Sequence, residues 1–288
     1  MNRLKLVECP RDAMQGWSHF IPTALKTEYL NALLQVGFDT LDFGSFVSPK
    51  AIPQLADTKE VLRGLDLTNT QTRLLAIIAN VRGAEEAVVY DEISYLGFPF
   101  SISETFQRLN TNSSISESLN TVEKIQHLCV RHRKEAVTYI SMGFGNPYGD
   151  EYSPELAIRW VEELSKLGLR IFAISDTVGV SEPGNISRIY HELQQAFPAL
   201  EFGAHFHSTP ERTNEKLEAA WNSGCRRFDS ALNGIGGCPM AQNDLVGNIA
   251  TEKAFEFFSS RGIDTGLHLE ALEQALVLAK RVFQTTNE

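Results

Sequence analysis

Two histidines stand two residues apart at the end of an apolar stretch of the chain. The segment reads Gly203-Ala204-His205-Phe206-His207, in a chain of 288 residues that contains only 7 histidines. In a β-strand, residues i and i+2 point to the same face, so His205 and His207 would project side by side while Phe206 packs on the other face. Two imidazoles aimed at one point suit a metal ion or, less often, a hydrogen-bonded pair. Each could equally be a polar strand-end residue bonded to the backbone, so the choice depends on the rest of the chain.

The dipeptide Arg11-Asp12 could complete such a site. Asp12 with His205 and His207 would give a mixed nitrogen and oxygen site, which favours Mg²⁺ or Mn²⁺ over a structural zinc held by thiolates. Taken alone, Asp12 would be a turn or helix-start carboxylate. The guanidinium of Arg11 could hold a carboxylate or a developing oxyanion, and its alternative is a surface ion pair.

Three further residues could take part in chemistry. Asp42 follows Leu41 inside an apolar stretch, where a carboxylate that points inward is either paired or functional. For Asp176 the same choice holds, and a structural role is at least as plausible. Cys238 follows a glycine-rich loop, where a thiol can deliver or accept a proton. The other cysteines are expected to be buried and inert: Cys9, Cys129 and Cys225.

Apolar strand-like runs alternate with amphipathic helical segments from end to end. About eight such units in about 260 residues is the size of a (β/α)₈ TIM barrel, although a doubly wound open sheet is a rival. No glycine-rich loop follows the first strand, which weakens the nucleotide-binding version of that rival. We expect one domain over residues 1–288 with Leu269–Phe283 as an extra C-terminal helix. The predicted strands are Leu4–Cys9, Thr40–Phe46, Leu74–Asn80, Glu92–Ile102, Ala136–Phe144, Arg170–Ser175, Glu201–His207 and Arg227–Leu232. Helical segments include Thr23–Val36, Ile115–Arg133, Pro154–Leu167, Ile186–Phe197 and Arg212–Ser223.

In a barrel, chemistry gathers where the strands end. Most candidate residues follow this rule, because Asp12, Asp176, both histidines and Cys238 lie at or just after predicted strand ends, while Asp42 is carried by the second strand. The opposite ends of the strands show no similar set.

Composition limits the partners and the compartment. A net charge of −10 argues against nucleic acid or an anionic membrane as the main partner. We expect neither a signal peptide, because the apolar start is too short, nor a membrane span, because no apolar run approaches about 18 residues. The four cysteines show no CxxC spacing. A reducing cytoplasm is therefore the expected location.

With these residues in view, the chain resembles the hydroxymethylglutaryl-CoA lyase family, part of a metal-dependent TIM-barrel group that includes the isopropylmalate and homocitrate synthases. The histidine pair and Arg11-Asp12 belong to the whole group, whereas Ser45–Lys50 and the Gly236-Gly237-Cys238-Pro239 loop are more specific to the lyases. The remaining matching segments are Pro53–Asp57, Asp176–Val180 and Gly247–Glu252.

The resemblance implies a retro-Claisen cleavage of 3-hydroxy-3-methylglutaryl-CoA to acetyl-CoA and acetoacetate. It implies that a divalent cation is bound by Asp12, His205, His207 and Asn248. Arg11 would stabilise the product enolate, and Cys238 would transfer a proton. From its place on a strand that faces the ligands, Asp42 is expected to remove the hydroxyl proton or to orient the group that does. Gln15 and Asp176 would support the site or contact the substrate. The implied partners are an acyl-CoA substrate and a second copy of the chain in a homodimer.

The chain departs from the family pattern at several positions. Asp42 replaces a usual Glu, Ala13-Met14 replaces Gly-Leu, and Phe206 and Ser208 replace Cys and Asp around the histidines. Two other functions remain open. A condensing acyltransferase would use the same metal site, but Cys238 in its loop favours the lyase. A non-catalytic barrel is disfavoured because Arg11, Asp12 and both histidines are intact.

Overall fold

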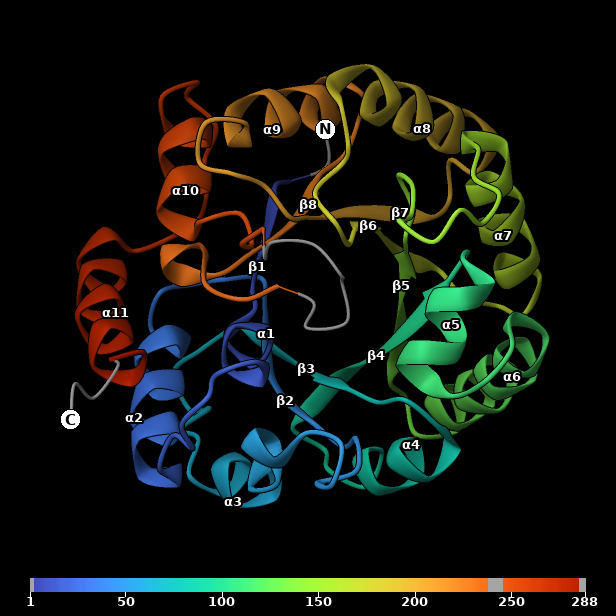
Figure 1. Ribbon diagram of the computed structural model, residues 1–288. Coiled ribbons are helices and arrows are strands. Elements are labelled where there is room, and N and C mark those ends of the chain that lie inside the picture. Colours follow the sequence, from blue (N-terminus) through green and yellow to red (C-terminus); the bar gives the residue numbers. More distant parts are fainter. Residues whose placement is uncertain (1–2, 238–245, 285–288) are drawn as a thin grey trace.

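The computed structural model describes residues 3–237 and 246–284 of the chain. Eight parallel strands form a closed barrel in which each strand pairs with the next and β1 pairs with β8 (Figure 1). The predicted TIM barrel is confirmed. The strands are β1 (Lys5–Glu8), β2 (Thr40–Ser45), β3 (Arg73–Ile77), β4 (Ile93–Ser101), β5 (Glu135–Ser141), β6 (Ile171–Asp176), β7 (Glu201–Phe206) and β8 (Arg227–Ser230).

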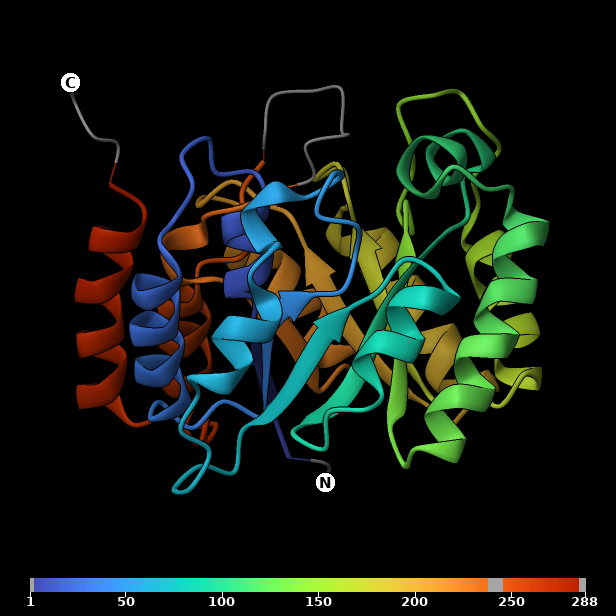
Figure 2. The same cartoon turned by 90° about the horizontal axis from the view of Figure 1, so that it is seen from below.

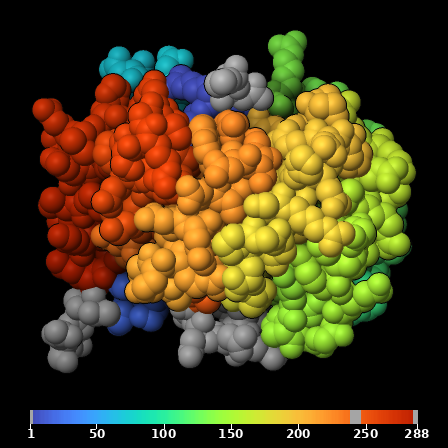
Figure 3. All heavy atoms as spheres, turned by 90° about the horizontal axis from the view of Figure 1, so that it is seen from above, coloured from blue at the N-terminus to red at the C-terminus, as the bar shows by residue number. Residues whose placement is uncertain are grey.

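Helices follow the strands and surround the barrel (Figure 1). Figure 3 shows α8, α9, α10 and α11 packed against their neighbours as one continuous outer face. The expected extra C-terminal helix is α11, which packs beside α2. The helices are α1 (Pro10–Gln15), α2 (Thr23–Leu34), α3 (Thr58–Arg63), α4 (Val81–Ala87), α5 (Glu104–Thr111), α6 (Ile115–Arg131), α7 (Pro154–Lys166), α8 (Pro183–Ala196), α9 (Thr213–Asn222), α10 (Thr251–Ser259) and α11 (Leu269–Val282), with 3₁₀ turns η1 (Pro53–Leu55) and η2 (Leu232–Gly234). None of the described helices is long and apolar enough to cross a membrane.

Side chains alternate between the inside of the barrel and the helices, as strand geometry requires. On β8, Phe228 packs against Trp221 and Phe258 of the outer layer. Its neighbours Arg227 and Asp229 therefore point into the barrel. The apolar part of the interior is a separate cluster from the outer core: Leu75, Ile77, Tyr95, Val137, Tyr139, Ile171 and Ala173.

A buried carboxyl group links the first strand to the segments that follow the last strand. Glu8 ends β1 and is fully buried. Its Oε1 accepts a hydrogen bond from the Leu232 N–H at 2.8 Å, and its Oε2 accepts one from the Thr251 hydroxyl at 2.5 Å. The Glu8 side chain thus connects the end of β1 both to η2 and to the first residue of α10.

The short helix α5 lies beyond the carboxyl ends of the strands rather than in the outer ring (Figure 2). Ser103 caps it, because its hydroxyl accepts a hydrogen bond from the Phe106 N–H at 3.1 Å. Asp150, in the segment between β5 and α7, accepts hydrogen bonds from the Ser103 hydroxyl and the Thr105 N–H at 2.5 and 2.9 Å. These bonds hold α5 over the end of the barrel where the candidate residues gather.

Candidate metal and active site

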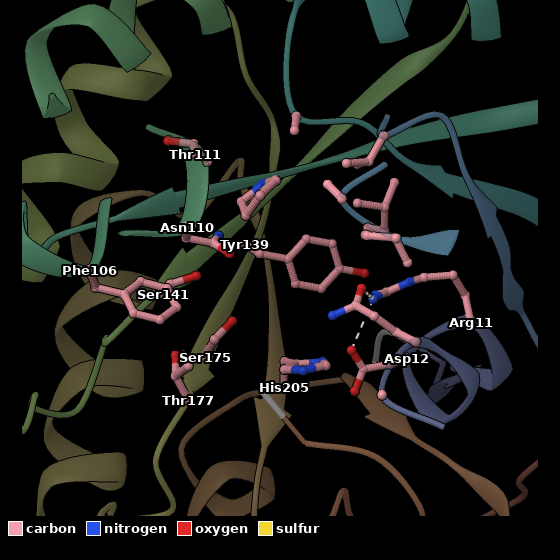
Figure 4. A pocket seen from close by; sticks show the side chains of 18 of the residues that line it. Arg11, Asp12, Phe106, Asn110, Thr111, Tyr139, Ser141, Ser175, Thr177 and His205 are labelled. Carbon is pink, nitrogen blue, oxygen red and sulfur yellow. Dashed lines mark hydrogen bonds and ion pairs between the residues drawn. The ribbon is translucent and has the colours of Figure 1, made fainter. Parts of the chain in front are cut away.

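A pocket of about 570 Å³ opens at the carboxyl ends of the strands (Figure 4). Arg11 and Asp12 of α1 lie on one side of it, and Phe106 of α5 lies on the opposite side beside Ser141 and Ser175 (Figure 4). Its lining comprises Arg11, Asp12, Gln15, Gly16, Trp17, Val47, Ala51, Ile52, Ile77, Ala79, Pro99, Phe106, Leu109, Asn110, Thr111, Tyr139, Ser141, Ser175, Thr177, His205 and His207. The Arg-Asp pair and the histidine pair, which are far apart in sequence, thus share one cavity.

The two histidines face one point together with Asp12. Their ring centroids are 5.5 Å apart, and one ligand atom from each of Asp12, His205 and His207 lies within 4.8 Å of the other two. The β-strand spacing that suggested this pair is present, since His205 lies on β7 and His207 follows its last residue. The arrangement is a compact triad of one carboxylate and two imidazoles.

His207 is prepared to act as a neutral ligand. Its Nδ1 lies 3.0 Å from the carbonyl oxygen of Thr177, to which it can donate. That tautomer leaves a lone pair on Nε2, which is buried and has no hydrogen-bond partner among the described residues. Burial, followed by the neighbouring His205, lowers the pKa of His207 to about 4. The imidazole therefore stays uncharged at neutral pH. Neither a proton nor a hydrogen-bond donor among the described residues occupies the Nε2 lone pair, which a metal ion could use.

Asp229 orients the other imidazole. Its Oδ2 lies 3.1 Å from His205 Nδ1, so the second ring nitrogen is left for the triad. Burial lowers the pKa of His205, but the hydrogen bond and the charge of Asp229 outweigh it and raise the pKa overall. The sequence analysis did not single out Asp229. The available signal was the i, i+2 spacing of Arg227 and Asp229 on one strand, which places two charged side chains on the same face.

Asn248 lies beside the triad. Its Nδ2 donates to Asp12 Oδ2 at 2.8 Å and to the Ile235 carbonyl at 3.0 Å. A backbone bridge pairs Asn248 with His207, which brings the amide to this place from a distant part of the chain. Both recorded side-chain bonds use the amide nitrogen, and a metal ligand would have to use the oxygen. A rotation of the amide group by 180° interchanges the two atoms.

Arg11 holds two carboxylates at once. Its Nε and Nη2 donate to Asp42 Oδ2 at 2.9 and 2.6 Å, and its Nη1 donates to Asp12 Oδ1 and Gln15 Oε1, both at 2.9 Å. These bonds account for four of the five N–H groups of a guanidinium, so one N–H on Nη2 remains. Arg11 lines the pocket, where that N–H can meet a substrate oxygen.

Asp42 is fully buried and is not among the residues that line the pocket. Oδ2 accepts both bonds from Arg11, while Oδ1 has no hydrogen-bond partner within the described part of the chain. Burial raises the pKa of Asp42 to about 6, although Arg11 lowers it. In this position the carboxylate orients Arg11 directly and could reach a substrate only after a rearrangement.

Asp176 acts on the site through a lysine. Its Oδ2 accepts a hydrogen bond at 2.7 Å from Lys216 Nζ, and both side chains are fully buried. The same ammonium donates to the His207 carbonyl oxygen at 2.9 Å. Asp176 does not line the pocket, so this pair anchors the main chain of a triad residue. The sequence analysis did not identify Lys216, since a lysine on an amphipathic helix gives no sign that it is buried.

The charges at the site favour a divalent cation. Of three buried carboxylates at this end of the barrel, those of Asp12 and Asp42 bind the Arg11 guanidinium. The third, that of Asp229, lies near the buried guanidinium of Arg227, so three carboxylates face two guanidinium groups. Burial raises the pKa of Asp12, but Arg11 and the two histidines outweigh it and lower the value to about 2. Asp12 therefore carries its charge at neutral pH. Excess negative charge, two imidazoles and oxygen donors are a set that fits Mg²⁺ or Mn²⁺.

The predicted thiol Cys238 lies outside the described residues. The loop that leads to it is described as far as Gly237, and Gly236 has φ 110°, in the region that favours glycine. A Cβ on Gly236 would lie 2.5 Å from Asn248 Nδ2. Glycine at this position therefore lets the loop pass directly beside the candidate ligand.

Comparisons with known proteins agree with this geometry. The HMGL-like family model matches residues 4–278. The chain is 32% identical to the human cytoplasmic 3-hydroxy-3-methylglutaryl-CoA lyase, over 99% of this chain and 76% of that protein. It is 33% identical to the hydroxymethylglutaryl-CoA lyase YngG of Bacillus subtilis, over 92% of this chain and 88% of that one. Among solved structures, an HMG-CoA lyase from Acinetobacter baumannii in complex with coenzyme A and 3-methylmalate superposes with a TM-score of 0.90 at 31% identity, covering 98% of this chain and 91% of that chain. On these grounds the chain belongs to the HMGL-like family, the family of the hydroxymethylglutaryl-CoA lyases.

Proposed function

We propose that this protein is a divalent-metal-dependent lyase that cleaves 3-hydroxy-3-methylglutaryl-CoA to acetyl-CoA and acetoacetate. The observation that carries the proposal is the triad of Asp12, His205 and His207 beside Arg11 in one pocket. The named activity of the relatives supports the same reaction. The barrel would be the single catalytic domain.

The residues that would hold the cation are Asp12, His205, His207 and Asn248. Mg²⁺ and Mn²⁺ are the candidates, because the set contains no thiolate and the local charge is negative. When bound, the cation supplies positive charge that lowers the pKa of the substrate's tertiary hydroxyl group.

The chain's own groups would then carry the bond changes. Removal of the hydroxyl proton turns the C–O bond into a ketone carbonyl as the adjacent carbon–carbon bond breaks, and the electron pair passes to the thioester as an enolate. The free N–H of Arg11 is positioned to stabilise the enolate oxygen. Asp42 would either remove the hydroxyl proton or, as its bonds to Arg11 favour, hold the guanidinium in place while Asp12 or a water takes that proton.

The enolate carbon must finally take up a proton. We assign this transfer to Cys238, whose thiol follows the glycines beside Asn248. A thiol there would protonate the enolate carbon as a proton donor stronger than a hydroxyl. Gln15, which accepts a hydrogen bond from Arg11, would help to orient it.

The apolar residues in the pocket lining fit an acyl-CoA. Trp17, Ile52, Phe106 and Leu109 line the pocket and could pack against the uncharged arm of the thioester. The solved relative that contains coenzyme A supports this class of substrate. We further propose a homodimer and a cytoplasmic location, and the free thiols of Cys9, Cys129 and Cys225 suit a reducing compartment.

The test is release of acetoacetate from 3-hydroxy-3-methylglutaryl-CoA. Exhaustive chelation should abolish it, and added Mg²⁺ or Mn²⁺ should restore it. His207→Ala should need far more metal, since loss of one ligand should cost several kcal/mol of charge stabilisation. Full activity after chelation would contradict the metal proposal. Release of coenzyme A only when acetyl-CoA and a 2-keto acid are supplied would identify the condensing acyltransferase instead.

A further inference from the structure

Below the pocket, three potential ligand atoms of different chemistry face one another inside the barrel. They are the Cys9 thiol, an imidazole nitrogen of His205 and a carboxylate oxygen of Asp229, all within 4.8 Å of each other, and all three residues are buried. The pairing of the strands sets this spacing. His205 is the register partner of Asp229, and the Cys9 N–H donates to the Ser230 carbonyl oxygen at 2.8 Å.

Oxygen atoms that could complete a coordination shell lie in the same region. Asp229 Oδ1, Asp42 Oδ1 and the Tyr139 hydroxyl are buried and have no hydrogen-bond partner in residues 3–237 and 246–284. The Tyr139 ring packs edge-on against His205, with ring centroids 5.5 Å apart. Asp229, Cys9 and Asp42 are all close enough to Tyr139 to raise the pKa of its hydroxyl, after the larger effect of burial. Unsatisfied buried oxygens are costly unless something else binds them.

Donor type then decides which cation fits. A thiolate with an imidazole and a carboxylate is a donor set for zinc and related thiophilic ions, whereas Mg²⁺ and Mn²⁺ favour oxygen-rich sites. The buried Arg227 lies close enough to Asp229 and Tyr139 to interact with both. Three carboxylates against the two guanidinium groups of Arg11 and Arg227 still leave a net negative charge that favours a divalent ion. We propose that Cys9, His205 and Asp229 form a second cation site, selective for thiophilic divalent ions, that shares His205 with the candidate Mg²⁺ or Mn²⁺ site.

The shared imidazole makes the two sites compete. Two divalent ions on one histidine would lie only a few ångströms apart in a poorly solvated interior, where like charges repel strongly. A thiophilic ion would therefore expel the ion held at Asp12 and His207. On binding, the S–H bond of Cys9 and the N–H bond at His205 Nδ1, the nitrogen that faces Asp229, both break, and sulfur–metal and nitrogen–metal bonds form. The thiol proton leaves to solvent and the ring proton passes to Nε2, with no change of oxidation state. None of this depends on the proposed lyase reaction.

Cobalt(II) gives a direct readout, because a thiolate ligand produces an intense charge-transfer band in the near ultraviolet. The metal-free protein titrated with Co²⁺ should show this band. Both Cys9→Ala and Cys9→Ser should lose it, and the serine variant guards against a folding defect. Cys225→Ser, a matched change of another buried cysteine, and Cys238→Ser should keep it. A wild-type protein without the band, or a band that survives both Cys9 variants, would overturn the proposal.

Competition can be measured without any enzyme assay. Zinc added to the Mn²⁺-loaded protein should release Mn²⁺, which is detected by its free-ion electron paramagnetic resonance signal. In Cys9→Ala, the zinc concentration for half-release should rise at least about 10-fold, the usual scale for losing a metal partner. Equal zinc concentrations in the two proteins would mean that zinc only replaces Mn²⁺ at Asp12, and the second site would be refuted. The Co²⁺ band and the Mn²⁺ release both report metal binding, so they test the second site even if the protein has no lyase activity.

Discussion

Asp42 and Arg11 form a buried pair in which one carboxylate oxygen takes two N–H donors. Replacement by Asn keeps the shape and removes the charge that holds the guanidinium. We expect Asp42→Asn to lower kcat by about 10²-fold or more with little change in KM, whether Asp42 is the base or positions Arg11. Steady-state kinetics on 3-hydroxy-3-methylglutaryl-CoA measure this.

The matched control is Asp39→Asn, because Asp39 also binds an arginine but does so away from the pocket, at Arg73. That variant should keep its kcat. If Asp42→Asn retains kcat within a factor of about three, neither role applies and Asp42 serves only the fold.

Cys238 should be the cysteine that matters to turnover. A hydroxyl is a much weaker proton donor than a thiol, so Cys238→Ser should lose at least about 10²-fold in kcat. Cys129→Ser should affect stability at most, because Cys129 is buried on α6 away from the pocket. Parent-rate turnover by Cys238→Ser would remove the thiol from the mechanism.

Among single residues, those that could be predicted from the sequence were the ones whose local spacing is distinctive. His205 and His207 were predictable because the period of a strand places i and i+2 on one face. Asp229 and Tyr139 were not, since a single Asp or Tyr in a strand resembles any other inward-facing residue. Their importance arises from contacts across the barrel, to His205 in both cases.

At the scale of elements, α9 supports β7 through Lys216. Its ammonium lies between Asp176 and the His207 carbonyl oxygen, with no exposed surface. Replacement of Lys216 by Met keeps much of the side-chain volume but leaves the buried Asp176 carboxylate without its cationic partner. Breaking such a pair costs about 3–5 kcal/mol. We expect a loss of this size in the free energy of unfolding of Lys216→Met, measured with urea, and weaker Mn²⁺ binding because His207 loses its anchor.

The surface pair of Lys166 and Glu163 gives the comparison, because both side chains are about half exposed. Lys166→Met should change the free energy of unfolding by less than about 0.5 kcal/mol. Equal losses in the two variants would show that the buried pair contributes no more than a surface one.

Element boundaries were harder to predict than the presence of elements. β8 ends at Ser230, two residues before the predicted end at Leu232, because η2 begins there. The helix α5 was not among the predicted segments, although it forms a wall of the pocket. Its eight residues contain Asn110 and two threonines, and it depends on Asp150 from a distant loop. Local patterning does not reveal a helix that is held by such a long-range contact.

For the whole molecule, the regular alternation of strands and helices predicted a parallel sheet of crossover units and favoured the barrel by their number, but it left a doubly wound open sheet as a rival. The pairing of β1 with β8 decides for the closed barrel. What alternation does not reveal is how the ring is sealed between its first and last strands. Backbone pairing of β1 with β8 seals the ring, and Glu8 adds a side-chain connection from β1 to η2 and α10, with its carboxyl group completely buried.

The ionisation of Glu8 should make the stability of the whole barrel depend on pH. Burial raises its pKa from 4.5 to about 8, despite the hydrogen bonds from Thr251 and Leu232 that lower it. The folded protein thus keeps a proton that the unfolded chain has lost, and unfolding releases it. Its contribution to stability is therefore fully present below pH 4.5 and is lost as the pH rises to about 8.

Glu8→Gln removes this titration while keeping an amide that can hydrogen-bond at the same place. We expect the free energy of unfolding of the wild type to fall, relative to Glu8→Gln, as the pH rises from 4.5 to about 8. Urea unfolding at a series of pH values measures the difference between the two proteins, so that other titrating groups cancel. Glu60→Gln, a change at an exposed carboxylate on α3, should follow the wild type throughout. Parallel curves for the wild type and Glu8→Gln would show that Glu8 is ionised in the folded barrel, and that its two hydrogen bonds are strong enough to hold a buried charge.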